Sequence, residues 1–176
     1  MTEGRLLSRV ARVDALPHEG QTVTIEATSA EREALAAFLK LPAISVLTAT
    51  LRVEPWGRGG ARVTGAVHGE LTQTCVVSLE PFPATVDEAV DVRFAPEAAV
   101  ESRPPAKETV LLADEDEPDP VIDGKIDLGA LAAEFFALGL DPYPRKPGVT
   151  FEQGEESASP DSPFSALADR AKPGPD

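Results

Sequence analysis

Apolar and polar residues alternate along several stretches of this chain, as they do in a strand that buries one face. The alternation is clearest in residues 61–77, where Val63 and Val67 fall on one side. Gly65 and Gly69 fall on that same side, which indicates a bulge or the close approach of another part of the chain. Further strands are predicted at residues 44–54 and 85–94.

The N-terminal region, residues 1–27, is predicted to form a strand, a turn and a second strand. Leu16, Pro17 and Gly20 lie in the predicted turn, where Pro and Gly suit a reversal of the chain. Residues 22–27 then alternate with a period of two. We expect the two strands to pair as a hairpin.

Two segments have the 3.6-residue period of a helix instead. The first covers residues 28–40, where Thr28 and Glu31 have the spacing of a capping box. The second covers residues 127–140, with Asp127 as the expected N-cap. Its apolar face is wide, so we expect this helix to be mostly buried.

Two further segments have no such periodicity. Residues 97–121 combine prolines with the acidic run 114–117, and residues 152–176 are rich in Ser, Pro, Glu, Asp and Gly. Such compositions favour a flexible acidic insert and a disordered C-terminal tail. The remaining domain, residues 1–151, is predicted to be α+β. It should have a curved, mainly antiparallel sheet of five to six strands, with one helix on one side and the second near a sheet edge or end.

Composition refines this picture. Apolar residues make up 42% of the chain and aromatic residues only 5%, so the core should be aliphatic. The net charge is −14, and residues 97–176 hold 18 acidic but only 7 basic side chains. This charge disfavours broad contact with a phosphate backbone and favours solubility or a basic partner. We find no apolar stretch long enough to span a membrane and no secretory signal.

Candidate catalytic chemistry is sparse. The chain has one cysteine and two histidines, too few for a structural zinc site, and we predict no metal or cofactor site. A catalytic Cys75 would need a nearby base. His68 should face away on the same strand, whereas His18 stays open as a partner. A small packed cysteine is the favoured interpretation, and no catalytic residue is assigned.

A small basic patch is the best candidate for a binding site. Arg145 and Lys146 lie on a proline-stiffened segment beside Tyr143. They could contact RNA phosphates or an acidic partner, with Tyr143 available for stacking. The alternative is a pair of surface side chains that flank the core.

Two segments resemble a known family. Residues 73–82, which include Cys75, Glu80 and Pro81, and residues 126–148 resemble the YceD family, the large ribosomal RNA subunit accumulation proteins. The first segment is similar to the form typical of alphaproteobacterial members. Many relatives carry additional cysteines after the last helix, but residues 141–145 contain none here, which removes any metal site that the resemblance would imply.

The resemblance implies a cytoplasmic bacterial protein in ribosome biogenesis, needed for accumulation, processing or stability of 23S ribosomal RNA. Its expected partners are precursor large-subunit rRNA, ribosomal or assembly proteins, or both, without a membrane and with the oligomeric state left open. No catalytic residue follows from the family pattern, so a non-enzymatic binding factor is favoured. The alternatives are a thiol- or metal-dependent hydrolase or nuclease acting on RNA, and a general acidic adaptor.

Overall fold

The computed structural model describes residues 6–97 and 118–150, and the fold is described for these residues. The chain divides into two compact units, Met1–Lys146 and Pro147–Asp176. Most of the predicted insert 97–121 and all of the predicted tail 152–176 lie outside the described residues. Within residues 6–97 and 118–150, no helix has the length and apolar character that crossing a membrane requires.

All the elements belong to the first unit. In chain order they are β1 (Val10–Arg12), the 3₁₀ helix η1 (Val13–Ala15), β2 (Gln21–Glu26), α1 (Ser29–Leu39), β3 (Ala43–Trp56), β4 (Gly60–Thr74), β5 (Pro81–Pro96), β6 (Asp119–Val121), β7 (Lys125–Asp127) and α3 (Leu128–Leu138).

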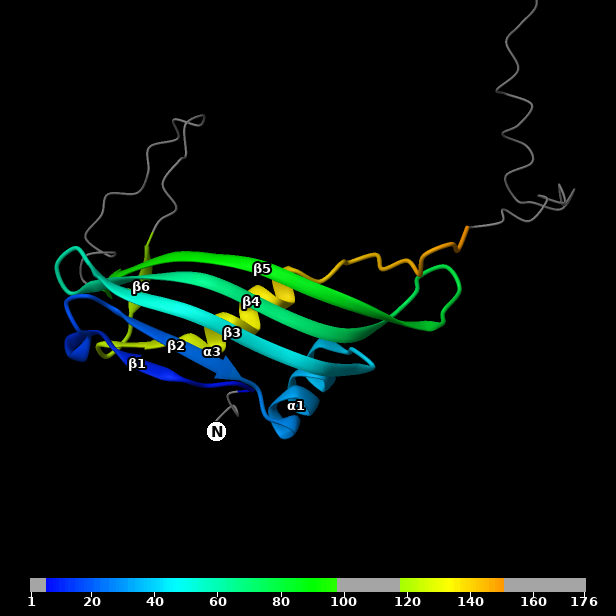
Figure 1. The fold of residues 1–176 in the computed structure, drawn as a ribbon, viewed down its shortest axis with the longest axis horizontal. Coiled ribbons are helices and arrows are strands. Elements are labelled where there is room, and N and C mark those ends of the chain that lie inside the picture. Colours follow the sequence, from blue (N-terminus) through cyan, green and yellow to red (C-terminus); the bar gives the residue numbers. More distant parts are fainter. Residues whose placement is uncertain (1–5, 98–117, 151–176) are drawn as a thin grey trace, which may run out of the picture. The chain divides into compact units, whose positions relative to one another are not determined.

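Five strands form one sheet in the order β2-β3-β4-β5-β6, while β1 and β7 form a separate two-stranded sheet (Figure 1). Neighbouring strands are antiparallel except for the parallel pair β5–β6. The α+β fold class with a mainly antiparallel sheet is therefore confirmed. The predicted helix 28–40 is confirmed as α1, including its capping box between Thr28 and Glu31.

The buried face of the large sheet packs against α3. Phe136 of α3 is fully buried, and an added Cβ on Gly69 of β4 would lie only 2.4 Å from its ring. Gly69 therefore lets the ring rest directly on the sheet, as the sequence indicated. The buried apolar residues of the three long strands and α3 form one continuous core: Ile44, Leu47, Ala49, Leu51, Val53, Ala61, Val63, Val67, Leu71, Val86, Val90, Phe94, Leu128, Leu131, Ala132 and Phe136.

Three expectations are wrong. The first strand does not pair with β2; β1 pairs with β7, with Val10 opposite Asp127. The strand predicted for 61–77 ends at Thr74, because Cys75 begins a turn. The second helix was expected near a sheet edge or end, but α3 packs on the buried face of the sheet, against β4 and β5.

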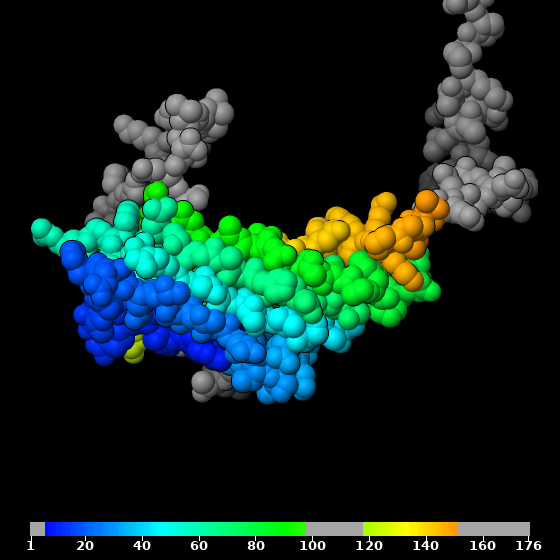
Figure 2. Space-filling model, in the orientation of Figure 1, coloured from blue at the N-terminus to red at the C-terminus, as the bar shows by residue number. Residues whose placement is uncertain are grey.

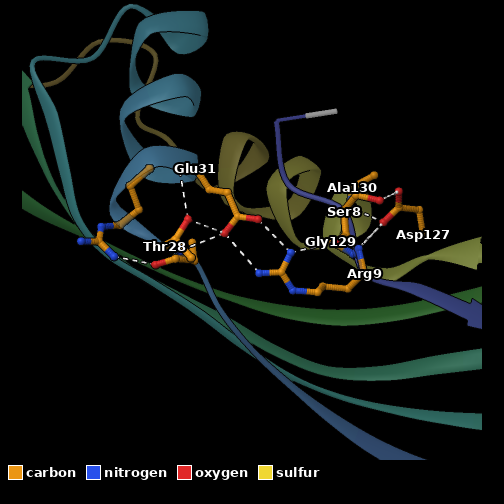
Figure 3. Close-up of polar contacts among 9 residues, drawn as sticks. Ser8, Arg9, Thr28, Glu31, Asp127, Gly129 and Ala130 are labelled. Atoms are coloured by element: carbon orange, nitrogen blue, oxygen red, sulfur yellow. Dashed lines mark hydrogen bonds and ion pairs between the residues drawn. The ribbon is translucent and has the colours of Figure 1, made fainter. Parts of the chain in front are cut away.

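A polar network explains the pairing of β1 (Figure 3). Asp127 caps α3 by accepting the backbone N–H groups of Gly129 and Ala130 at 3.1 and 3.2 Å. The same carboxylate accepts the Ser8 hydroxyl at 2.6 Å and the Arg9 backbone N–H at 2.8 Å. The Asp127 carboxylate thus satisfies hydrogen-bond donors both at the N-terminus of α3 and in the N-terminal segment.

The Arg9 guanidinium extends this network to α1. It donates to both carboxylate oxygens of Glu31, at 2.8 and 3.1 Å. Glu31 also accepts the backbone N–H of Thr28 at 2.8 Å. The pKa of Glu31 is lowered to about 2, chiefly by the hydrogen bond from Arg9 and then by the backbone N–H of Thr28. The N-terminal segment is therefore joined to the first turn of both helices.

We predict that Glu31→Gln destabilises the protein by about 1–2 kcal/mol at pH 7, because it removes the charge from a bidentate pair. The lowered pKa means that the ionised Glu31 stabilises the fold at pH values above 4.5, and that this contribution is lost as the pH falls toward 2. Urea unfolding of both proteins at several pH values should show the stability difference shrinking on acidification. Asp14→Asn, which breaks the exposed pair with Arg12, is the control and should have little effect. An equal effect of the two substitutions would contradict the prediction.

We predict that Gly69→Ala destabilises the protein by about 1–3 kcal/mol, because the new methyl group overlaps the Phe136 ring. The sign of the change in the free energy of unfolding is informative, since alanine normally stabilises a strand interior relative to glycine. Ala66→Val, on the exposed face of the same strand, is the control and should be tolerated. Thermal unfolding of the three proteins measures the difference, and a stabilised Gly69→Ala variant would contradict the packing described here.

Candidate functional site

Most of the residues that the sequence singles out lie where β4 passes into β5. The turn from Cys75 to Glu80 joins the two strands, and Pro81 begins β5. The Cys75 N–H donates to the Glu80 carbonyl and the Leu79 N–H donates to the Cys75 carbonyl, both at 2.9 Å. Leu79 adopts the left-handed conformation with φ of 60°, which tightens the turn.

The Cys75 thiol is enclosed by this turn. It has no solvent exposure, and its Sγ accepts the backbone N–H groups of Val77 and Ser78 at 3.4 Å each. The pKa of the thiol is lowered to about 6, first by the Ser78 hydroxyl and then by the backbone N–H groups of Ser78 and Lys146. Hydrogen bonds outweigh desolvation here, which alone would raise the pKa.

Neither histidine accompanies the thiol, as expected for His68, and His18, the partner that the sequence leaves open, does not reach it. His68 lies on the outer face of β4, with its Nδ1 2.7 Å from the Asp87 carboxylate. His18 lies in the turn before β2, and no hydrogen bond or ion pair joins it to Cys75 within the described residues. The buried position agrees with a packed cysteine and shows no path for a substrate to the sulfur.

The segment after α3 covers the turn. The Val76 N–H donates to the Pro144 carbonyl at 2.9 Å. The side chain of Gln73 donates to the Asp141 carbonyl at 3.2 Å. Lys146 Nζ lies 2.8 Å from a carboxylate oxygen of Glu80. The two segments that carry the family resemblance are therefore packed together.

This packing reduces the positive charge that the predicted basic patch, Tyr143, Arg145 and Lys146, can offer to a ligand. Lys146 is paired with Glu80, which offsets its charge. Tyr143 is 73% exposed, and Arg145 is exposed as well. Arg145, which has no ion pair with any residue of 6–97 or 118–150, and the ring of Tyr143 are thus available on this segment. The neighbouring prolines Pro142 and Pro144 line a groove of about 460 Å³ between the C-terminal ends of α1 and α3, and neither Tyr143 nor Arg145 is among its lining residues.

The second feature is the outer face of the large sheet, which the sequence did not single out. In Figure 1 this face is turned toward the viewer with α3 behind it, and in Figure 2 no described helix lies over it. The register places its side chains in cross-strand rows. One row joins Glu54, Arg62 and Arg93, and the next joins Thr22, Arg52, Thr64 and Asp91.

Arginines gather at the end of this face near the β3–β4 hairpin. We call Arg52, Trp56, Arg58, Arg62 and Arg93 the Arg–Trp patch. The Arg93 guanidinium lies over the Trp56 ring, 5.9 Å from its centroid. Arg62 makes two hydrogen bonds to Asp91, at 2.8 and 2.6 Å, and Arg52 pairs with Glu54 at 3.0 Å. Arg58 and Arg93 form no ion pair with another described residue.

The sequence contained only part of the signal for this patch. Trp56 and Arg58 fall in a glycine-rich connection that predicts a flexible link. Arg93 is 37 positions from Trp56, and only the β4–β5 register brings the two together. Gly57 and Gly59 take positive φ values of 60° and 77°, so the hairpin turns tightly and holds Trp56 at the edge of the patch.

Metal ligands do not cluster in this part of the chain. Among residues 6–97 and 118–150, no three His, Cys, Asp or Glu side chains are placed to hold a metal ion. The acidic run 114–117 lies outside these ranges.

Comparison with known proteins identifies one family. The model of the large ribosomal RNA subunit accumulation protein YceD matches residues 63–169. The matched range contains the Cys75 turn, α3 and the segment that covers the turn. No curated protein and no solved structure matches the chain. Because the match covers more than half of the 176 residues, the chain belongs to the YceD family, described as large ribosomal RNA subunit accumulation proteins.

Proposed function

We propose that this protein is a non-enzymatic factor that supports the accumulation, processing or stability of 23S ribosomal RNA. The observation that carries the proposal is membership of the YceD family over residues 63–169. We further propose that it acts in the bacterial cytoplasm, by binding precursor rRNA, ribosomal or assembly proteins, or both. Its negative charge favours partners that carry positive charge over part of their surface.

The Cys75 turn supports a binding role over thiol catalysis. A nucleophilic thiolate must reach the substrate, whereas Cys75 has no exposed surface. Its sulfur is used by the backbone N–H groups of Val77 and Ser78, which shape the turn. The pKa of the thiol is lowered first by the Ser78 hydroxyl and then by the backbone N–H groups of Ser78 and Lys146, so the lowered pKa needs no catalytic base. A structural role therefore accounts for the hydrogen bonds of the sulfur described above.

The direct test is depletion of the protein from its own cells. We predict a lower ratio of mature 23S to 16S rRNA, together with unprocessed or degraded 23S precursor, in RNA separated on gels and mapped by sequencing. Expression of the full chain should restore the ratio. An unchanged 23S to 16S ratio after complete depletion would contradict the proposed function.

We predict that Cys75→Ser restores 23S rRNA in depleted cells as well as the unchanged chain does. Serine keeps an acceptor for the N–H groups of Val77 and Ser78, so the turn should persist. The stability cost should be about 1 kcal/mol, as for other small buried changes. Thermal unfolding checks the fold. A folded Cys75→Ser protein that fails to restore 23S rRNA would favour the thiol-dependent alternative.

A further inference from the structure

We propose that the Arg–Trp patch binds single-stranded RNA, with its arginines on the phosphates and Trp56 against a base. The inference deepens the proposed function, on which it rests for the choice of RNA as the biological ligand. Trp56, Arg58 and Arg62 precede the range that the family model matches, whereas Arg93 lies within it.

Charge is the first argument. Four of the chain's 16 Lys and Arg residues lie in this one patch, although the net charge is −14. Glu54 and Asp91 offset two of the four, which leaves Arg58 and Arg93 to meet a ligand anion. A phosphate backbone neutralises such charges and releases its own counterions, which is the main source of affinity for nucleic acid.

The geometry of the arginines is the second argument. The ring of Trp56 holds the Arg93 guanidinium in place, so less side-chain entropy is lost when a phosphate binds. The bidentate contact with Asp91 likewise fixes the plane of the Arg62 fork.

The part of the outer face next to the Arg–Trp patch suits an extended single strand of RNA. The row next to the patch is Thr24, Thr50, Ala66 and Ala89, which are small and uncharged. Small side chains of this kind leave room for unpaired bases, and Trp56, which is 37% exposed, offers an aromatic ring for stacking.

The opposite end of the same face sets a limit to the site. Glu26, Glu70 and Asp87 lie there, and among the residues that the structure describes only the Asp87 side chain has an ion-pair partner, His68. Negative charge at that end repels phosphate. RNA should therefore be confined to the end near the β3–β4 hairpin.

The segment with Tyr143, Arg145 and Lys146 is the competing RNA surface. Its lysine is already paired with Glu80, and Asp141 adds a further negative charge close by. The Arg–Trp patch presents two unpaired arginines and the segment presents one. The observations therefore favour the patch, and the experiment compares the two directly.

Trp56 is the only tryptophan in the chain, so its fluorescence reports on the patch itself. We predict that a 15-nucleotide oligouridylate changes this fluorescence to saturation in low salt, with a dissociation constant of about 1–100 µM. For about two neutralised phosphates, one at Arg58 and one at Arg93, log affinity should fall against log salt with a slope of about −1.4. No fluorescence change together with no anisotropy change of a labelled oligouridylate would overturn the inference.

Variants locate the contact. Arg58→Gln combined with Arg93→Gln should weaken oligouridylate binding about tenfold and bring the salt slope close to zero. The matched control is Arg12→Gln, an exposed arginine on β1 that should leave binding unchanged. Thermal unfolding confirms that each variant is folded. Binding that is lost in Arg145→Gln but kept in the double variant would overturn the inference in favour of the Tyr143 segment.

The same double variant separates this inference from the proposed function. If depletion lowers 23S rRNA and the double variant restores it fully, the patch is not the functional surface and the inference fails alone. If the double variant binds oligouridylate normally but loses a ribosomal protein, the patch is a protein surface and the inference also fails. If the patch binds RNA but depletion leaves 23S rRNA unchanged, the proposed function fails and the binding site stands.

Discussion

The packing of α3 on a single face of the large sheet determines the rest of the structure. The Phe136 ring rests on Gly69, and the long strands turn their apolar residues toward the helix. Burial of that one face is the main source of stability for a sheet of this kind. It also decides where polar chemistry can lie, because every other residue of the long strands must face outward. The outer face and the two ends of the sheet are therefore the surfaces left for binding.

The two ends differ in chemistry because different constraints form them. At one end, the backbone of the Cys75 turn and the segment after α3 satisfy each other's hydrogen bonds, which leaves few free polar groups. At the other end, the short glycine-rich hairpin leaves side chains free to meet across the strands. The family resemblance concentrates at the first end, whereas positive charge concentrates at the second. A binding factor could use the first as its structural core and the second as its contact surface.

Local signals made the helices predictable. The capping box of Thr28 and Glu31 and the cap at Asp127 act within three residues, and the structure has both. The pairing of β1 was not predictable in this way, because Asp127 provides the partner more than a hundred residues away. The end of β4 at Thr74 depends on backbone contacts to Cys75 that alternation does not reveal. Likewise, the site residue Arg93 meets Trp56 only through the register of two long strands.

The link between Arg9 and Asp127 has a consequence for synthesis of the chain. Their hydrogen bond spans 118 positions. The segment around β1 is therefore synthesised long before β7, the strand with which it pairs. At about 5–20 residues per second this delay is on the order of 10 s. During that time Ser8 and Arg9 have no native partner in Asp127, while β3 and β4 can already form a hairpin. The N-terminal segment is thus made first and fixed last, and translation of residue 127 sets the earliest moment at which the domain can close.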